Sequence, residues 1–225
     1  MRTKERTDSL YKYTRLEFLN STLLNGIYAS NLNELNDPYE CFGYPEELKL
    51  KVVCLSRSRN KKLMWSHYAN GHRGCSIKIV PPNDYGTEDC ELKRVQYSSK
   101  IIRYPNIKGK EFIEQLYIKD KKWEYELEVR AVFDPDNYDG DRWKIRRDKT
   151  YYQVKISQVD FGCFADRDPF YLDALIVLRD YNTNHKKKIK VRKYKMSDKK
   201  YEFIIDKEFD YIKEIAKLTN EEATE

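Results

Sequence analysis

Apolar and polar residues alternate most regularly between positions 123 and 133. Apolar side chains at every second position point one way, and Glu124, Glu126, Glu128 and Arg130 point the other way, which is the pattern of a β-strand with one buried face. Less regular runs predict further strands. These runs cover residues 10–13, 27–30, 51–57, 75–80, 92–98, 150–159, 186–195 and 200–205.

Helical spacing of apolar residues predicts helices over residues 15–25, 61–70, 108–119 and 169–179. The predicted strands outnumber the helices and do not alternate with them, which favours an α+β protein with a mixed or antiparallel sheet over a doubly wound fold. No internal repeat and no Gly/Ser or Pro-rich linker interrupts the chain. We therefore expect a single domain over residues 8–206, followed by a C-terminal helix or tail over residues 207–225.

Composition narrows the class of protein. Charged residues make up 36% of the 225 residues, while 19 Tyr, 9 Phe and 3 Trp give the chain enough apolar surface for a core. No apolar run approaches the roughly 18 residues of a membrane helix, and no apolar segment follows the first six residues as in a secretory signal. We expect a cytoplasmic protein that does not bind membranes.

Cysteine and histidine are too sparse to favour a structural zinc site. The five cysteines never form a Cys-x-x-Cys pair, so we expect free thiols in a reducing compartment. Only His67, His72 and His185 could supply imidazole ligands. Phosphate-binding loops, dinucleotide-binding Gly-x-Gly-x-x-Gly, nucleophile elbows and His-Glu-x-x-His are also absent, which leaves the corresponding enzyme classes without support.

The segment Asn36-Asp37-Pro38-Tyr39-Glu40 combines three turn-forming residues. Loops at strand ends often carry functional polar groups. Turn chemistry alone also explains each residue type, because Asn and Asp side chains bind backbone N–H groups.

The predicted helix 61–70 contains Leu63, Met64, His67 and Tyr68 on one apolar stripe, with Trp65 and Ala69 on the neighbouring side. In one interpretation His67 is an ordinary packed histidine. In the other, His67 binds or transfers a proton in the wall of an aromatic pocket.

The glutamate row on the predicted strand 123–133 also has two interpretations. Carboxylates this close repel one another unless they are solvated or paired, and Arg130 can relieve one of them, most plausibly Glu128. An exposed row is an ordinary polar surface. A row that lines a cleft could orient a ribose or supply a base.

Residues 185–200 hold nine Lys or Arg against the single acid Asp198, in a chain with a net charge of +6. Lysines that protect a sheet edge would explain this stretch. Nucleic-acid binding is the alternative, and it would require the lysines to lie beside aromatic side chains on the same surface.

The order of these motifs is more specific than any one of them. Leu-Tyr-Lys-Tyr at 10–13, Asn-Asp-Pro-Tyr-Glu at 36–40, Leu-Met-Trp-Ser-His-Tyr-Ala at 63–69 and Trp-x-Tyr-Glu-x-Glu-x-Arg at 123–130 follow one another. This series resembles a widespread bacterial family of unknown function, whose members read LYKY, FNDPFE, MWSHYA and YExExR in that order. The resemblance extends weakly over residues 8–206, and Leu35 replaces the usual Phe.

The layout is also similar, at the level of the fold, to that of ADP-ribosyltransferases, which are α+β domains with a split sheet. This similarity implies NAD as the substrate and a glutamate that stabilises the cation-like transition state by charge. The first strand lacks the Arg or His that those enzymes usually have. The similarity implies a catalytic set of Glu126, Glu128, Tyr13, Ser30 and His67, and an NAD-binding set of Lys12, Asn36, Asp37, Trp65, Tyr68 and Arg130.

Two hypotheses follow for the function. The first is an NAD-using ADP-ribosyltransferase-like enzyme, a toxin or phage-defence effector, in which these residues meet in one cleft. The second is a binding module without turnover, for nucleic acid or a nucleotide, with the glutamates paired to Arg130. A metal-dependent nuclease is a weaker third, and it requires Asp37, Glu40, His67 and Glu126 to meet.

Overall fold

The computed structural model describes residues 9–41, 49–88, 90–101, 110–135 and 141–222. It confirms the α+β class, with mixed and antiparallel sheets and flanking helices. Contacts divide the chain into two compact units, and we describe each by itself. Unit 1 comprises 1–8, 25–58 and 81–154, and unit 2 comprises 9–24, 59–80 and 155–225.

The sheet of unit 2 is mixed. Its strands lie in the order β14-β13-β12-β5-β1, and only the pair β12 and β13 is parallel. The strands are β1 (Leu10–Thr14), β5 (Cys75–Val80), β12 (Lys155–Phe161), β13 (Lys190–Met196) and β14 (Phe203–Ile205). The predicted strands 186–195 and 200–205 are therefore confirmed with shorter bounds. β13 is not an edge strand along its whole length, because its first half pairs with β12 and its second half with β14.

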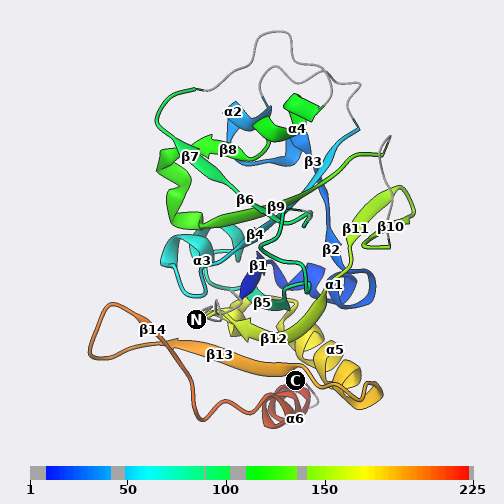
Figure 1. The fold of residues 1–225 in the computed structure, drawn as a ribbon. Coiled ribbons are helices and arrows are strands. Elements are labelled where there is room, and N and C mark those ends of the chain that lie inside the picture. The colour runs from blue at the N-terminus through cyan, green and yellow to red at the C-terminus, as the bar shows by residue number, and fades with distance from the viewer. Residues whose placement is uncertain (1–8, 42–48, 89, 102–109, 136–140, 223–225) are drawn as a thin grey trace, which may run out of the picture. The chain divides into compact units, whose positions relative to one another are not determined.

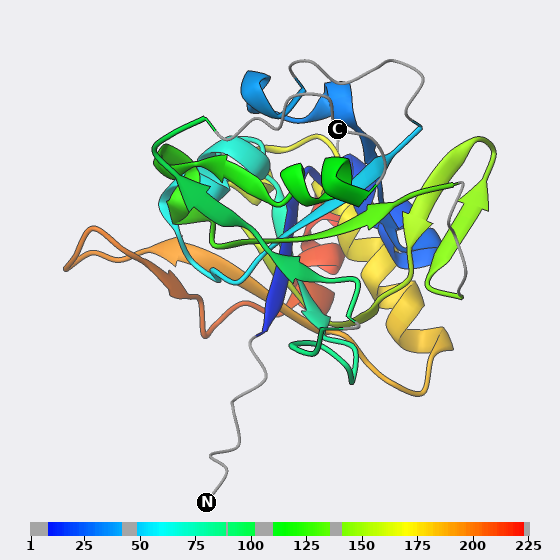
Figure 2. The same cartoon turned by 45° about the horizontal axis from the view of Figure 1, so that its top comes forward.

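Helices cover one face of this sheet. They are η1 (Leu16–Phe18), α1 (Leu19–Asn25), α5 (Tyr171–Asn184) and α6 (Tyr211–Glu222), and the short η4 (Ala165–Arg167) precedes α5. Their apolar side chains form one core with Ile77 of β5 and Val159 and Phe161 of β12. Figure 2 shows α6 beside α5. The predicted C-terminal helix thus contributes Ile215 to the core of unit 2.

The opposite face of the unit 2 sheet carries α3 (Lys62–Tyr68). Trp65 packs edge-on against Tyr13 of β1 and Tyr194 of β13, with ring centroids 5.2 and 5.4 Å apart. The prediction that Leu63 and His67 lie on the buried stripe was wrong. Both are exposed, while Trp65, Met64 and Ala69 are buried.

Unit 1 contains three small sheets (Figure 1). The largest has the antiparallel order β3-β4-β9-β6, β2 extends the β10–β11 hairpin, and β7 and β8 form a parallel pair. The bounds are β2 (Ile27–Tyr28), β3 (Ser30–Asn31), β4 (Lys51–Ser56), β6 (Lys93–Arg94), β7 (Gln96–Ser98), β8 (Ile118–Asp120), β9 (Glu128–Phe133), β10 (Trp143–Arg146) and β11 (Lys149–Tyr152).

The described part of unit 1 also contains four short helices: η2 (Leu32–Glu34), α2 (Pro38–Cys41), α4 (Lys110–Gln115) and η3 (Lys121–Glu126). Its apolar cluster joins Leu32, Leu50, Val52 and Leu116. The predicted helix 108–119 ends at Gln115, and residues 108 and 109 lie outside the described part of the chain.

The predicted strand 123–133 was wrong in its first half. Residues 121–126 form η3, and Leu127 ends it in the left-handed conformation with φ of 47°, before β9 begins at Glu128. A left-handed Leu is uncommon because its Cβ approaches the following carbonyl oxygen. The alternation of apolar residues across 123–127 is therefore accidental. Because Leu127 adopts this left-handed conformation, the chain turns sharply between Glu126 and Glu128.

Candidate functional site

The most concentrated group of charged side chains in unit 1 is buried. Lys119 of β8 lies at its centre, with its Nζ atom 2.7 Å from Oε2 of Glu126, 3.2 Å from Oε2 of Glu128 and 3.6 Å from Oε2 of Glu40. Its ammonium group also lies 4.8 Å from the centroid of the Trp123 ring. All four charged side chains are at most 5% exposed.

Arg130 of β9 completes this cluster. Its Nε donates to Oε1 of Glu128 at 2.7 Å and its Nη2 to Oε2 of the same carboxylate at 2.9 Å, which is a bidentate pair. Nη2 also donates to Glu40, and Nη1 donates to the carbonyl oxygen of Leu116 at 2.6 Å. We call Glu40, Lys119, Glu126, Glu128 and Arg130 the buried ion cluster.

Local backbone structure explains how η3 and β9 supply both glutamates. The Asp120 carboxylate caps η3 by accepting from the Lys122 N–H at 3.0 Å, and the left-handed Leu127 reverses the chain after Glu126. The Ser56 hydroxyl of β4 donates to the carbonyl of Glu126 at 2.5 Å, and Tyr97 Oη lies 2.8 Å from the Glu128 nitrogen and accepts its N–H. These bonds fix the backbone on both sides of the turn.

Electrostatics divide the carboxylates of the cluster into two kinds. Burial alone would raise the pKa of Glu128, but Arg130 and Lys119 hold that pKa at about 2. The pKa of Glu40 is instead raised, because burial outweighs the attraction of Arg130 and Lys119 and because Glu128 lies near. Three carboxylates surround two cations, and Oε2 of Glu40 accepts no hydrogen bond from any residue described. Of Glu40 and Glu128, Glu40 therefore takes up a proton more readily.

Glu126 and Glu128 are both bound by buried cations of unit 1. A catalytic glutamate must reach its substrate, whereas Glu126 and Glu128 face two buried cations. Removing one partner from a buried pair typically costs about 3–5 kcal/mol, because the other charge stays buried and uncompensated. The binding-module hypothesis expects the glutamates to pair with Arg130, and the geometry of Glu128 agrees with that expectation.

The other predicted site residues of unit 1 lie in the 30–37 segment. Ser30 is half-buried on β3 opposite Val52, and Asn36 is exposed. Asp37 is buried, and its Oδ1 accepts from the Tyr39 N–H at 3.0 Å, so that it caps α2 as the turn interpretation expects. Its Oδ2 has no hydrogen-bond partner among the described residues.

The predicted site residues of unit 2 lie on β1 and α3. Lys12 is half-buried and Tyr13 is buried, and because they are neighbours on a strand they point to opposite faces. Burial, and next the neighbouring Tyr194, raise the pKa of Tyr13 far above its usual range. Trp65 is buried between two tyrosines, His67 is exposed, and Tyr68 is half-buried with its ring 6.1 Å from that of His67.

No metal centre is found among the residues that the structure describes, since no three His, Cys, Asp or Glu side chains there are grouped for one. Of the four residues that the nuclease alternative needs, Glu40 and Glu126 share the buried ion cluster, where Lys119 binds both.

The described helices also include none with the length and apolarity to span a bilayer.

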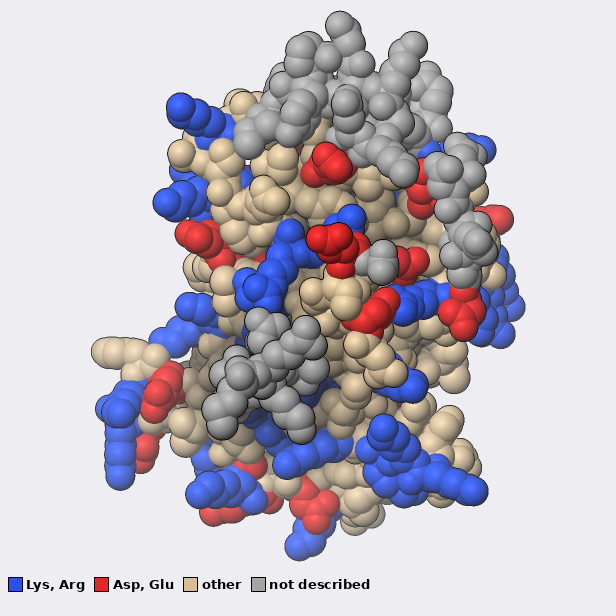
Figure 3. Space-filling view, in the orientation of Figure 1, with Lys and Arg blue, Asp and Glu red and all other residues tan. Residues whose placement is uncertain are grey.

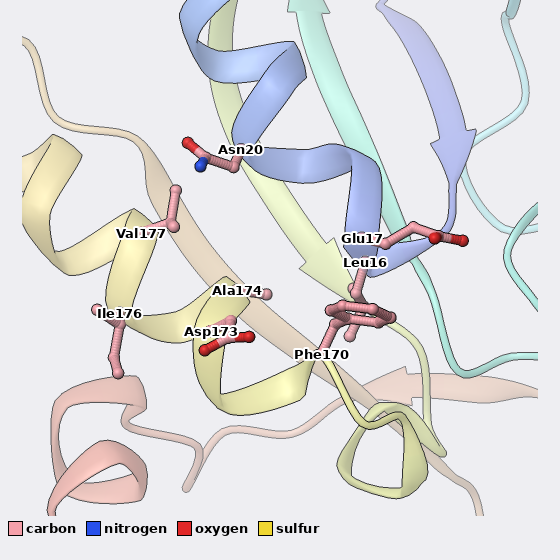
Figure 4. A pocket seen from close by; sticks show the side chains of 8 residues that line it. All are labelled: Leu16, Glu17, Asn20, Phe170, Asp173, Ala174, Ile176 and Val177. Carbon is pink, nitrogen blue, oxygen red and sulfur yellow. The ribbon is translucent and has the colours of Figure 1, made fainter.

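A pocket of about 340 Å³ opens in unit 2 between η1, α1 and the start of α5 (Figure 4). Leu16, Ala174, Ile176, Val177 and the Phe170 ring form its apolar walls. Its polar groups are Asn20, Asp173 and Glu17, and Glu17 binds Arg15 at 2.7 Å. None of the site residues predicted from the sequence lines this pocket.

The basic stretch 186–200 divides into paired and unpaired side chains. Arg192 binds the buried Asp160 through two bonds of 2.7 and 2.8 Å, while Lys193 binds Asp166 and Lys195 binds Asp206. The other six lysines are exposed and make no ion pair with any described residue. They are Lys186, Lys187, Lys188, Lys190, Lys199 and Lys200.

Figure 3 shows Lys and Arg side chains gathered where β13 and the end of α5 lie in Figure 1, with Asp and Glu side chains scattered between them. Aromatic rings adjoin one end of this stretch. Lys62 lies 5.8 Å from the Tyr201 ring centroid and 6.0 Å from that of Phe203, and the His72 and Phe203 rings are 4.9 Å apart. We call the six lysines that make no ion pair with any described residue, which lie at the two ends of β13, the lysine track; the Nζ atom of Lys188 also donates to the carbonyl oxygen of Asn182.

No pattern in the sequence points to Lys119, the centre of the buried ion cluster. It is one lysine among many, in a segment that apolar spacing predicts as a helix, whereas it lies on β8. Comparison with known proteins adds no further residue. No family model, no curated protein and no solved structure matches the chain.

Proposed function

We propose that this protein is a non-catalytic module that binds nucleic acid through the lysine track. The observation that carries this proposal is the set of six exposed lysines without an ion-pair partner among the described residues. Cations that are free of carboxylates can neutralise phosphates and release condensed counterions.

The shape of β13 supports a linear partner. The strand has seven residues, which at strand rise correspond to roughly 23 Å, and unpaired lysines precede and follow it. The four lysines at its start and the two beyond its end can contact phosphate groups that are separated by this length. A compact anion would engage only part of the lysine track, whereas a polymer engages its whole length.

The buried ion cluster supports a module without turnover. Its glutamates bind the buried Lys119 and Arg130, which is the geometry expected of the binding alternative. The NAD-consuming transferase stays a prediction. It would require Glu126 or Glu128 to exchange a buried cation for a ribose, at the cost of breaking that pair.

A charge-reversal experiment tests the proposal. The variant Lys187→Glu/Lys190→Glu changes two exposed lysines of the track. We expect it to weaken binding to a labelled 20-nucleotide oligonucleotide about tenfold or more at 0.05 M salt, as counterion release predicts for two lost phosphate contacts.

The matched control is Lys121→Glu/Lys144→Glu, which makes the same change in net charge at two exposed positions of unit 1. It should retain most of the affinity. Equal weakening by both double variants would show a diffuse charge effect and would overturn the lysine track, and no measurable binding by the wild type would overturn the proposal itself.

Nicotinamide release from NAD tests the transferase prediction on the same preparations. For a non-catalytic module we expect no nicotinamide release from the wild-type protein. Release that is lost in Glu126→Gln or Glu128→Gln, in variants whose melting curves remain cooperative, would replace the binding module with the enzyme.

A further inference from the structure

We propose that the tip of the β13–β14 hairpin is a stacking platform for unpaired bases, with Tyr201 as its main surface, so that the module prefers single strands. This inference rests on the proposed function, because it names the kind of nucleic acid that the lysine track binds. In this proposal the lysine track contacts the phosphate groups of the strand and Tyr201 contacts one of its bases.

Tyr201 is 99% exposed, whereas the other exposed aromatic side chains among the described residues, Phe18, Tyr39 and Phe170, are between 42% and 63% exposed. Aromatic rings bury a large apolar area and contribute strongly to core packing, so a ring that is entirely exposed contributes nothing to stability. A fully accessible aromatic face is what base stacking requires, because every base has a π-face to present to it.

The hairpin tip is held by hydrogen bonds on both sides of Tyr201. The Ser197 N–H donates to the Glu202 carbonyl at 3.0 Å, and the Ser197 hydroxyl oxygen accepts from the N–H groups of Lys199 and Lys200 at 3.2 and 3.3 Å. The connection from Ser197 to Glu202 is thereby ordered before any ligand binds. An ordered platform loses less conformational entropy on binding than a free loop does.

A second contact holds the far side of the hairpin. The Asn60 side chain donates from Nδ2 to the carbonyl of Phe203 at 3.0 Å, which joins β14 to the segment before α3. In Figures 1 and 2 the hairpin extends away from the other strands of unit 2. The hairpin is therefore held in place by these hydrogen bonds, while the Tyr201 side chain at its tip remains accessible.

Charged and neutral groups are arranged around the ring as a nucleotide would need them. Lys199 and Lys200 directly precede Tyr201, and Lys62 reaches toward its ring and that of Phe203. Burial, and next the positive charge of Lys62, lower the pKa of His72. At neutral pH His72 is therefore an uncharged ring against Phe203 and continues the aromatic surface.

An anionic bilayer is the competing partner for a Tyr and Lys surface. Stable insertion needs a large apolar area, and the exposed apolar side chains of residues 196–202 are only the Tyr201 ring and Met196, in a segment that also carries the exposed acids Asp198 and Glu202. One ring is enough for one base, since base stacking does not require a wide apolar face. The observations therefore favour an unpaired strand.

The test compares a 20-nucleotide thymidine oligonucleotide with a 10-base-pair duplex, which carry similar numbers of phosphates. We expect Tyr201→Ala to weaken binding of the single strand by about fivefold or more, which is the lower end for one stacked base. It should leave the duplex within about twofold. Tyr201→Phe should keep the single-strand affinity, because stacking does not need the hydroxyl group.

Tyr39→Ala is the matched control, because Tyr39 is another exposed tyrosine, in unit 1, at 63% exposure. An unchanged single-strand affinity in Tyr201→Ala, together with a loss in Lys187→Glu/Lys190→Glu, would overturn the platform and leave the lysine track in place. Tyr201-dependent binding to vesicles of phosphatidylserine without Tyr201-dependent binding to the oligonucleotide would overturn it in favour of a membrane.

Discussion

Glu128 and Arg130 lie two positions apart on β9 and are joined by two parallel hydrogen bonds of 2.7 and 2.9 Å, with both side chains buried. Side chains at i and i+2 of a strand share one face, so the pair needs no distortion of β9 to form. Glu40 and Lys119 extend it to α2 and β8. Charge-assisted hydrogen bonds and ion pairs of these residues thus connect β9, α2 and β8 of unit 1.

Loss of the arginine should be strongly destabilising. Arg130→Met leaves Glu128 and Glu40 with Lys119 as their only cation in the cluster. We expect a loss of about 3–5 kcal/mol in the free energy of unfolding, as for other buried pairs broken on one side. Urea unfolding monitored by circular dichroism measures it.

Arg142→Met is the control for that prediction. Arg142 also binds a carboxylate, that of Asp84 at 2.9 Å, but both side chains are about one third exposed. Its loss should cost about 1 kcal/mol or less. Similar losses in the two variants would contradict the special role of the buried ion cluster.

The stability of the fold should depend on the ionisation of Glu128. A pKa of about 2 in the folded state, below the ordinary value of 4.5, means that its contribution is fully present above about pH 5. It is lost as the pH falls through that folded pKa. Glu128→Gln should therefore flatten the fall in stability between pH 5 and pH 2, measured by urea midpoints.

The pH dependence of the stability that Glu40 contributes should have the opposite sign to that of Glu128. Its raised pKa means that the folded state favours its protonated form, so its contribution to stability declines as the pH rises through the folded pKa. Glu40→Gln should consequently cost less stability at pH 8 than Glu128→Gln does. A larger loss from Glu40→Gln would contradict the division of the carboxylates into two kinds.

The turn of the β10–β11 hairpin can be improved. Arg147 and Asp148 form its two-residue connection, and both have positive φ, of 48° and 62°. Asn-Gly is preferred at such a turn, since Gly and Asn adopt the left-handed region more readily. Arg147→Asn/Asp148→Gly should raise the melting temperature by about 2–4 °C, the shift for roughly 1 kcal/mol in a chain of this size. A lower melting temperature would show that these side chains make necessary contacts.

The sequence predicted the class of the fold and most strands of unit 2, because β5, β12 and the helix at 171–184 have clear apolar patterns. It missed β10, whose turn to β11 carries Arg and Asp in place of Gly or Asn, and it predicted β11 and β12 as the single strand 150–159. It also predicted one strand through Leu127, because an alternating pattern does not reveal a left-handed residue. Conformations that tertiary contacts impose leave no local signal.

For the site, the sequence identified Glu126, Glu128 and Arg130 as a group and offered their pairing as one of two interpretations. It could not supply Lys119 or the approach of Glu40, because these contacts join β8, α2 and β9 across up to 90 positions of the chain. The lysines of 186–200 were visible from composition. The rings of Tyr201, Phe203 and His72 beside them depend on the pairing of β13 with β14.

The salt dependence of single-strand binding tests the central claim most directly. We would measure the affinity of the wild-type protein for the 20-nucleotide oligonucleotide between 0.05 and 0.2 M salt. If the six unpaired lysines contact phosphates, the slope of log K against log salt should be about −4, and Lys187→Ala/Lys190→Ala should reduce its magnitude by about 1.4. A slope near zero, or one that this double variant leaves unchanged, would contradict nucleic-acid binding through the lysine track.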